Sequence, residues 1–383
     1  SEEHRMSYTL VHLSDTHLGF SDLEKVSVDG VNVREQDFYD SFRHAVDIIL
    51  DTAPDAVVHT GDFFHRPSPG NRPMIEGLTQ LKRISDAGIP FIVIAGNHST
   101  PRSAYTSPIL KAMQSFDNVV PMFSQRYETA ELNGTVFHGV PHINDDRLFA
   151  EEMKKISPVS GKNNVLLLHA SLGKEYIMEE FGERIYPPDM KDVLKDFSYI
   201  ALGHWHGFQH IKKYGNAWYS GSTERLSDRE AGKEKGVAVV TIDSEGIPAV
   251  EFRPLSTRPW LRIDIDRCAG KTVEEIVSEL QAAGDMEDYT NALVSVYLHD
   301  IKPEQSMYIR NTMAAEPFKG ALSVVTKRIL KHADSAGGIH IDRAESLEEH
   351  FQSFLREKIE NDNEFNVVSK KAQYYFDSFE RGE

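Results

Sequence analysis

The sequence contains a single cysteine, Cys268, among its 383 residues. One cysteine excludes an internal disulfide framework and any zinc site built from several cysteines, and it fits a reducing compartment. No apolar run approaches the roughly 18 residues that a membrane-spanning helix needs. The N-terminal segment has neither the basic nor the apolar part of a secretory signal. These absences predict a soluble intracellular protein with no membrane partner.

Positive charge is also scarce, since 42 Lys and Arg stand against 59 Asp and Glu, a formal net charge of −17 with neutral histidines. Surfaces that bind nucleic acid are usually basic, so this balance argues against a nucleic-acid-binding protein. Net charge is a sum over the whole chain, however, and bound metal ions can supply positive charge where a phosphate binds. The 17 histidines are the abundant feature, and their positions decide the matter.

Hydrophobic residues make up 40% of the chain, enough for real cores, and the length suits two to three domains. The first half alternates short apolar runs with amphipathic stretches, which is the pattern of a layered α/β fold. Predicted strands lie at 8–13, 55–60, 89–94, 164–168, 197–202, 217–219, 237–242 and 250–252. Predicted helices lie at 38–50, 74–87 and 107–116.

A proline-bounded loop at 254–259 predicts a domain boundary. Beyond it we expect a small α+β unit with strands at 260–265, 292–298 and 322–329 and helices at 272–282 and 303–313. A linker of small residues at 333–338 then precedes a helical tail. The predicted domains are residues 6–257, 258–333 and 339–383.

Residues that commonly ligate metals follow five of the apolar runs. In chain order they are Asp15 and His17, Asp62 and His65, Asn97 and His98, His169, and His204 and His206. Because loops at the carboxyl ends of strands form one crevice in an α/β sheet, these side chains can converge. A mixed oxygen and nitrogen set favours Mn²⁺, Fe²⁺ or Zn²⁺ over Mg²⁺ or Ca²⁺. Two such ions about 3.5–4 Å apart are the usual device for hydrolysing phosphoesters.

Taken in order, these motifs resemble the calcineurin-like metallophosphoesterase superfamily. Within it, they are most similar to the meiotic-recombination-eleven/SbcD family, the nucleases of double-strand-break repair. The closer resemblance rests on residues 13–19, 61–69 and 219–225. A protein phosphatase of the superfamily would have Asp-Arg-Gly where this chain has His65-Arg66-Pro67.

The resemblance implies a fold and a ligand set. The fold is α/β, a layered metallophosphoesterase β-sandwich flanked by helices, with an α+β capping and DNA-binding domain and a helical ATPase-docking segment. The first metal would be held by Asp15, His17, Asp62 and His206, and the second by Asp62, Asn97, His169 and His204. His98 would serve the leaving group and His65 the phosphate. The family usually has an acid after Asn-His, whereas this chain has Ser99, which supplies no charge to orient His98.

The implied function is a Mn²⁺-dependent DNA exonuclease and endonuclease, a hydrolase of DNA repair that cleaves phosphodiesters with a water activated by two metals. Its implied partners are DNA ends, single- or double-stranded, an SMC-like ABC ATPase and a second copy of the chain, in the cytoplasm or on the nucleoid. Two alternatives stay open. One is a phosphodiesterase of the same superfamily acting on small or cyclic nucleotides, which the acidic charge supports. The other is a scaffold that kept the fold without the chemistry.

The remaining histidines need no metal. His12 and His59 lie within predicted strands and should be packed or hydrogen-bonded, whereas His138, His142 and His210 are expected on the surface or in loops. Trp205 should pack to fix the loop between two ligands, and Cys268 should be inert.

The predicted helices at 74–87 and 107–116 carry narrow apolar stripes, which suit helix packing. The stripes are Met74, Leu78 and Leu81, and Ile109, Leu110 and Met113. They can face the central sheet or, as the resemblance implies, form a two-fold dimer contact.

Overall fold

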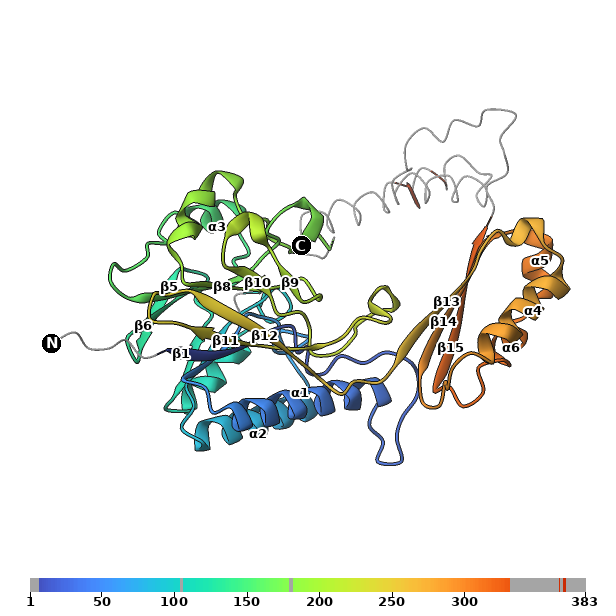
Figure 1. Cartoon of the computed structure of the whole chain (residues 1–383), viewed down its shortest axis with the longest axis horizontal. Coiled ribbons are helices and arrows are strands. Elements are labelled where there is room, and N and C mark those ends of the chain that lie inside the picture. The colour runs from blue at the N-terminus through green and yellow to red at the C-terminus, as the bar shows by residue number, and fades with distance from the viewer. Residues whose placement is uncertain (1–6, 104–105, 179–181, 331–364, 366–367, 370–383) are drawn as a thin grey trace. The chain divides into compact units, whose positions relative to one another are not determined.

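The computed structural model describes residues 7–103, 106–178, 182–330, 365, 368 and 369 (Figure 1). The chain divides into two units, residues 1–330 and 331–383. The predicted linker at 333–338 and nearly all of the predicted tail at 339–383 lie outside the described residues. The predicted domain limits therefore stay predictions.

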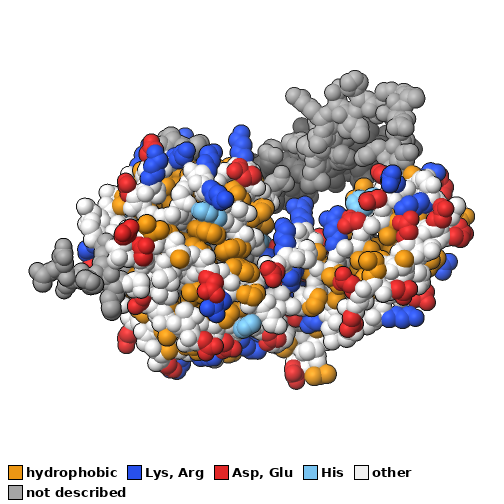
Figure 2. Space-filling view, in the orientation of Figure 1, with side chains coloured by type: hydrophobic (Ala, Val, Ile, Leu, Met, Phe, Trp, Pro, Cys, Tyr) orange, Lys and Arg blue, Asp and Glu red, His pale blue; other side chains and the backbone are white. Residues whose placement is uncertain are grey.

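Charge on the visible surface is mixed. Figure 2 shows acidic and basic side chains interspersed over the face in view, without one large patch of either sign. Basic side chains therefore reach the surface on this face alongside acidic ones.

The first sheet contains six strands in the order β12-β11-β1-β2-β3-β4. The neighbours from β1 to β4 run parallel, while β11 is antiparallel to both β1 and β12. Strands β1 to β3 are almost wholly buried, which explains why their sequences are continuous apolar runs. The bounds are β1 (Tyr8–Leu13), β2 (Ala56–His59), β3 (Phe91–Ile94), β4 (Val119–Met122), β11 (Gly236–Ile242) and β12 (Pro248–Pro254).

The second sheet has the order β5-β6-β7-β8-β10-β9, with β6, β7, β8 and β10 parallel. Its inner face packs against the first sheet: Phe137, Val165 and Leu167 share one buried cluster with Leu10 and Val58. The two sheets thus form a sandwich. The bounds are β5 (Glu128–Leu132), β6 (Thr135–Val140), β7 (Asn163–His169), β8 (Tyr199–Gly203), β9 (Gln209–His210) and β10 (Ala217–Tyr219).

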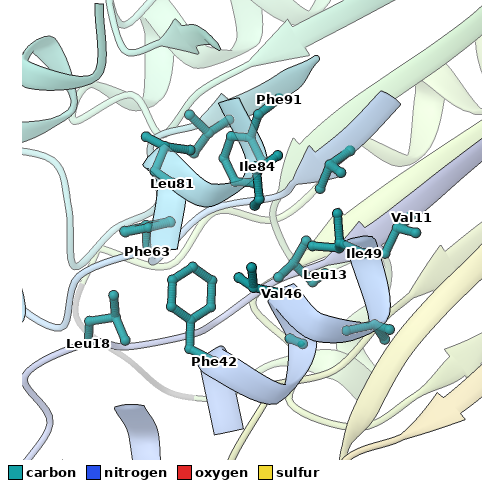
Figure 3. Close-up of a cluster of buried hydrophobic side chains, with 14 of the residues drawn as sticks. Val11, Leu13, Leu18, Phe42, Val46, Ile49, Phe63, Leu81, Ile84 and Phe91 are labelled. Atoms are coloured by element: carbon teal, nitrogen blue, oxygen red, sulfur yellow. The ribbon is translucent and has the colours of Figure 1, made fainter. Parts of the chain in front are cut away.

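Helices α1 (Val33–Thr52) and α2 (Asn71–Asp86) cover the outer face of the first sheet. Phe42, Val46 and Ile49 from α1 and Leu81 and Ile84 from α2 pack over the strands in one apolar cluster (Figure 3). Asn32 begins α1, because its side chain accepts hydrogen bonds from two backbone amides of the first turn. Across the sandwich, α3 (Asp146–Met153) and the 3₁₀ helix η3 (Pro188–Asp196) flank the second sheet.

Residues beyond the predicted seam form a three-stranded parallel sheet in the order β13-β14-β15. Its elements are β13 (Trp260–Ile265), α4 (Val273–Gly284), β14 (Leu293–Ile301), α5 (Pro303–Tyr308), α6 (Asn311–Ala315) and β15 (Ser323–Leu330). The single helix predicted at 303–313 is wrong, because the backbone at Ile309 leaves the helical region and separates α5 from α6.

The predicted fold class is confirmed for the described residues, which form sheets flanked by helices. The segment predicted as a helix at 107–116 is instead a 3₁₀ helix, η1 (Ile109–Ser115). Leu110 and Met113, three residues apart, share one side of such a helix and are buried in the core. In the described part of the chain, no helix is long and apolar enough to cross a membrane.

Candidate metal centre

Two loops that follow parallel strands are hydrogen-bonded to each other and form the floor of the site. The loop after β1 donates from the Asp15 amide to the Gly61 carbonyl at 3.1 Å and from the His17 amide to the Asp62 carbonyl at 2.9 Å. Asp15, His17 and Asp62 all have positive φ angles, between 41° and 51°. This backbone turns the predicted ligands away from their strands and toward one another.

Close backbone approaches explain two of the motif glycines. A Cβ on Gly61 would lie 2.2 Å from Nδ1 of His169, and a Cβ on Gly96 would lie 2.2 Å from Oδ1 of Asp62. Any side chain at either position would displace a predicted ligand. The glycine before Asp62 and the glycine before Asn97 are therefore required by the packing of the site.

The structure brings the predicted residues into overlapping clusters of potential ligand atoms, each within 4.8 Å. The clusters are Asp15, His17 and His206; Asp15, Asp62 and His169; and His17, His65 and His98. The first two match much of the predicted ligand sets, with Asp15 close to both. Asn97 joins the second, because its Oδ1 lies 2.9 Å from Nε2 of His169. The assignment of each ligand to one ion stays a prediction.

His17 gives the best evidence that the cluster fits a cation. Its ring is fully buried, and its Nε2 atom has no hydrogen-bond partner. Burying a polar atom without a partner is costly, so such an atom in a cluster of carboxylates and imidazoles indicates a missing ligand. The donor set of carboxylates, imidazoles and one amide fits a pair of divalent transition metals.

Hydrogen bonds also indicate which ring nitrogens carry protons in His65 and His98, the two outer histidines, which are only half-buried. Nδ1 of His17 lies 3.3 Å from Nδ1 of His65, so a His17 ring that ligates through Nε2 donates from Nδ1 to His65. His65 then carries its own proton on Nε2. Nδ1 of His98 lies 3.2 Å from the His65 carbonyl, which can only accept a hydrogen bond. Nδ1 of His98 therefore carries a proton, and Nε2 is the ring nitrogen that could transfer one.

Burial and neighbouring charge set opposite pKa shifts within the cluster. Burial lowers the pKa of His17 well below its usual range. Burial alone would also lower the pKa of His169, but the charge and hydrogen bond of Asp62, together with the charge of Asp15 and the Thr60 carbonyl, outweigh it and raise the pKa to about 9. Burial would raise the pKa of Asp62, yet His169 holds it well below the ordinary value. A cation binding here must therefore displace a proton from His169.

Two carboxylates that the motifs did not reveal hold the last histidine pair. Glu230 Oε1 accepts from Nδ1 of His206 at 3.0 Å, and Glu183 Oε1 lies 2.7 Å from Nε2 of His204. Lys235, also buried, pairs with Glu230 and donates to the His206 carbonyl at 2.8 Å. Carboxylates bonded to ligand histidines fix the ring orientation and tautomer.

Ser99 does not replace the acid that the family usually has at this place. Its Oγ points to the Phe64 carbonyl at 3.5 Å, and the His98 ring has a backbone carbonyl as an acceptor. The His98 amide donates to Oδ1 of Asp62 at 2.9 Å. His98 is thus positioned by backbone contacts and by its neighbour in the metal cluster.

The other histidines divide into three outcomes. His12 and His59 are buried and hydrogen-bonded to hydroxyls, as predicted. The prediction for His138 is wrong, because this residue is buried in β6 between Tyr127 and Asn164. His142 lies in a loop, though buried, while His210 stacks on Trp218 at the surface. Cys268 is free and buried.

A cavity of about 600 Å³ opens beside the outer histidines. Its lining includes His65, Asn97 and His98 together with two exposed guanidinium groups, Arg66 and Arg102. Basic side chains next to a metal cluster suit a phosphate-containing ligand. The described residues that line this cavity therefore include basic and no acidic side chains, although the chain as a whole is negatively charged.

Comparison with known proteins agrees with the motifs. Residues 8–208 match the family model described as calcineurin-like phosphoesterase. The chain is 28% identical over 360 residues to a "DNA double-strand break repair protein Mre11" of Thermoplasma acidophilum, covering 90% of this chain and 89% of that protein. It is 34% identical to the Sulfurisphaera tokodaii protein of the same name (63% and 61% covered) and 28% identical to that of Sulfolobus acidocaldarius (71% and 70%).

Proposed function

Because the chain belongs to the calcineurin-like phosphoesterase family, we propose that it is a DNA nuclease of double-strand-break repair. The predicted family and the prediction of a phosphoester-hydrolysing enzyme are confirmed by these matches. Similarity to proteins named Mre11 supports DNA as the substrate. The observation that carries the proposal is the buried cluster around His17, which has the donor set and the orphaned nitrogen of a metal centre.

The clustered residues support a dimetal site, and we propose Mn²⁺ as its metal, with Fe²⁺ or Zn²⁺ able to bind the same donors. Asp15, His17 and His206 would hold one ion, Asn97, His169 and His204 the other, and Asp62 would bridge them. When bound, such a pair activates a water and offsets the charge of the phosphate.

The chain's own residues supply the remaining chemistry. Nε2 of a protonated His98 donates to the oxygen that leaves the phosphorus, while its Nδ1 stays bonded to the His65 carbonyl. Nε2 of His65 donates to a phosphate oxygen, since its Nδ1 accepts from His17. Arg66 and Arg102 attract the DNA backbone to the adjoining cavity.

The variant His98→Leu tests this function on labelled duplex and hairpin DNA with Mn²⁺, Mg²⁺ or EDTA. Proton transfer contributes about 10²–10⁴-fold to such reactions, so we expect cleavage to fall by that factor while Mn²⁺ is still bound. Mn²⁺ binding measured by calorimetry is the control. Equal cleavage by wild type and variant would exclude His98 as the acid. The ratio of exonuclease to endonuclease products comes from the same gels.

The net charge of −17 favours one second candidate, a phosphodiesterase acting on small or cyclic nucleotides. Bis-p-nitrophenyl phosphate and cyclic nucleotides distinguish the two. Hydrolysis of these compounds without any cleavage of DNA in Mn²⁺ would establish the second candidate.

We further propose that residues 339–383 bind the SMC-like ABC ATPase of a repair complex that acts on DNA inside the cell. Amphipathic stretches with large aromatic residues cannot bury their apolar faces alone, and the relatives' names refer to break repair. A chain ending at Gly338 should lose co-purification with the ATPase and keep Mn²⁺-dependent cleavage. Co-purification of the shortened chain would refute the assignment.

A homodimer through the outer face of α2 is also proposed. Leu81, Leu110 and Met113 of the predicted stripes are buried in the core and cannot contact a partner. On α2, however, Ile75 is 67% exposed and lies one turn from half-buried Leu78. Light scattering should give twice 43.3 kDa for the wild type and a monomer for Ile75→Asp. Monomeric wild type at tens of micromolar would refute the dimer.

A further inference from the structure

A second cavity, of about 380 Å³, adjoins the metal cluster at His206. It shares the His206 ring with the metal centre, because His206 belongs to the ligand cluster and also lines the cavity. The family motifs do not explain its other walls. Its aromatic wall is Trp205, which stands between the predicted ligands His204 and His206.

Trp205 is held in place but is not covered. Its ring and that of Tyr176 form a T-shaped pair, with 5.5 Å between centroids and an interplanar angle of 81°. The indole is only partly buried, and Met178 adds apolar surface to the same cavity. Such a hollow, with an aromatic side chain in its wall, suits a flat heterocycle.

Cations stand at the same cavity. Arg229 and Lys233 both line it and are exposed, and the Lys233 ammonium lies 5.9 Å from the centre of the Trp205 ring. The described lining also includes two carboxylates. Glu230 is already paired with His206 and Lys235, so exposed Glu175 is the one acid of that lining left to oppose the two cations, and an excess of positive charge remains. The cavity thus combines an aromatic surface with positive charge, which are the two components of single-strand binding.

We propose that this cavity is a base subsite, in which an unpaired base next to the cleaved phosphodiester stacks on Trp205. Arg229 and Lys233 pair with the phosphate of that nucleotide. The proposal rests on the nuclease function, since His206 both lines the cavity and belongs to the cluster at which the phosphodiester would be cleaved. A base within a duplex is covered by its neighbours, so the subsite takes only a base that has left the stack.

The test combines Trp205→Ala with single abasic replacements on either side of the bond that is cut. For wild-type protein, kcat/KM should fall about tenfold when one particular base is missing, the loss typical of one stacking contact. Trp205→Ala should show a similar loss on intact DNA and little further loss at that abasic position. Trp205→Phe should retain most of the activity. If the kcat/KM losses from Trp205→Ala and from an abasic replacement simply add at every DNA position, the proposal is wrong.

Two controls separate the possible failures. Bis-p-nitrophenyl phosphate carries no base, so the loss for Trp205→Ala should be about tenfold greater on DNA than on this compound. In EDTA, labelled oligothymidylate should bind several-fold more weakly to Lys233→Ala than to Lys154→Ala, which removes one exposed charge elsewhere. Equal binding by the two variants would overturn the proposal. If wild type hydrolyses neither DNA nor bis-p-nitrophenyl phosphate in Mn²⁺, the nuclease function itself fails.

Discussion

The two halves of the metal centre are held in different ways. His206 is fixed by buried Glu230, whose charge is balanced by buried Lys235. His204 is fixed by Glu183, which lies in a loop and also accepts from the Ser171 hydroxyl and the Met178 amide. One half is therefore braced by a carboxylate in a buried ion pair with a lysine, and the other by a carboxylate that also binds a hydroxyl and a backbone amide. We expect the two metal ions to bind with unequal affinity, the tighter one beside His206.

Glu230→Gln should give the largest change, because it leaves Lys235 buried without its counter-charge. Removing one partner of a buried ion pair costs about 3–5 kcal/mol of unfolding free energy, and losing a carboxylate behind a ligand histidine weakens metal binding about 10–100-fold. Urea unfolding and calorimetry with Mn²⁺ measure both. The double variant with Lys235→Met should recover stability but not affinity. Unchanged affinity in either variant would contradict the bracing role.

Glu183→Gln should affect one metal and keep the chain folded. Among the described residues no buried lysine pairs with Glu183, so we expect the free energy of unfolding to fall by less than for Glu230→Gln, by about 1–3 kcal/mol for the lost charge-assisted hydrogen bonds. The weaker of the two Mn²⁺ binding steps should weaken by about tenfold, with the tighter step unaffected. Weakening of the tighter step instead would show that the halves are not distinct.

Acid should act on the buried strand histidine His12 at a higher pH than on Glu183. Burial lowers the pKa of His12, on β1, to about 3, so the unfolded chain binds the proton more readily. In EDTA, this contribution to stability is complete above pH 6.5 and falls by about 1.4 kcal/mol per pH unit below it. Burial would raise the pKa of Glu183, but hydrogen bonds from His204 and Ser171 lower it to about 2. The contribution of Glu183 to stability is therefore lost only below pH 4.5. Unfolding at pH 7.5, 6.5 and 5.5 should show a slope that His12→Gln reduces and Glu183→Gln does not.

Ser99→Ala should give the smallest effect. The Ser99 hydroxyl makes one long contact, of 3.5 Å, with the Phe64 carbonyl. We expect kcat on DNA within about twofold of wild type and a stability change of a few tenths of a kcal/mol. A tenfold loss of kcat would show that Ser99 orients His98.

Where a predicted ligand follows a strand, the structure brings it into the cluster, and its role stays a prediction. His169 and Asp62 come directly after buried apolar runs, and parallel strands must bring their carboxyl ends together. Glu183, Glu230 and Lys235 could not be predicted in this way. They lie in loops and at strand entries with no periodicity, and only the folded chain brings them to their histidines. The 3₁₀ geometry of η1 was missed because Leu110 and Met113 are spaced equally well for an α-helix.

The left-handed backbone of the ligand residues has a consequence for mutagenesis. Asp15, His17, Asp62 and His204 have φ angles from 41° to 94°, a region that asparagine, aspartate and histidine enter far more readily than other side chains. A substitution at any of these four positions therefore changes two properties at once, metal ligation and the preference for this backbone conformation. Asp62→Asn keeps the backbone preference and an oxygen to receive the His98 amide, so it isolates the loss of negative charge. Asp62→Ala adds conformational strain to lost ligation, and a phenotype measured with alanine alone would overstate what the metal contributes.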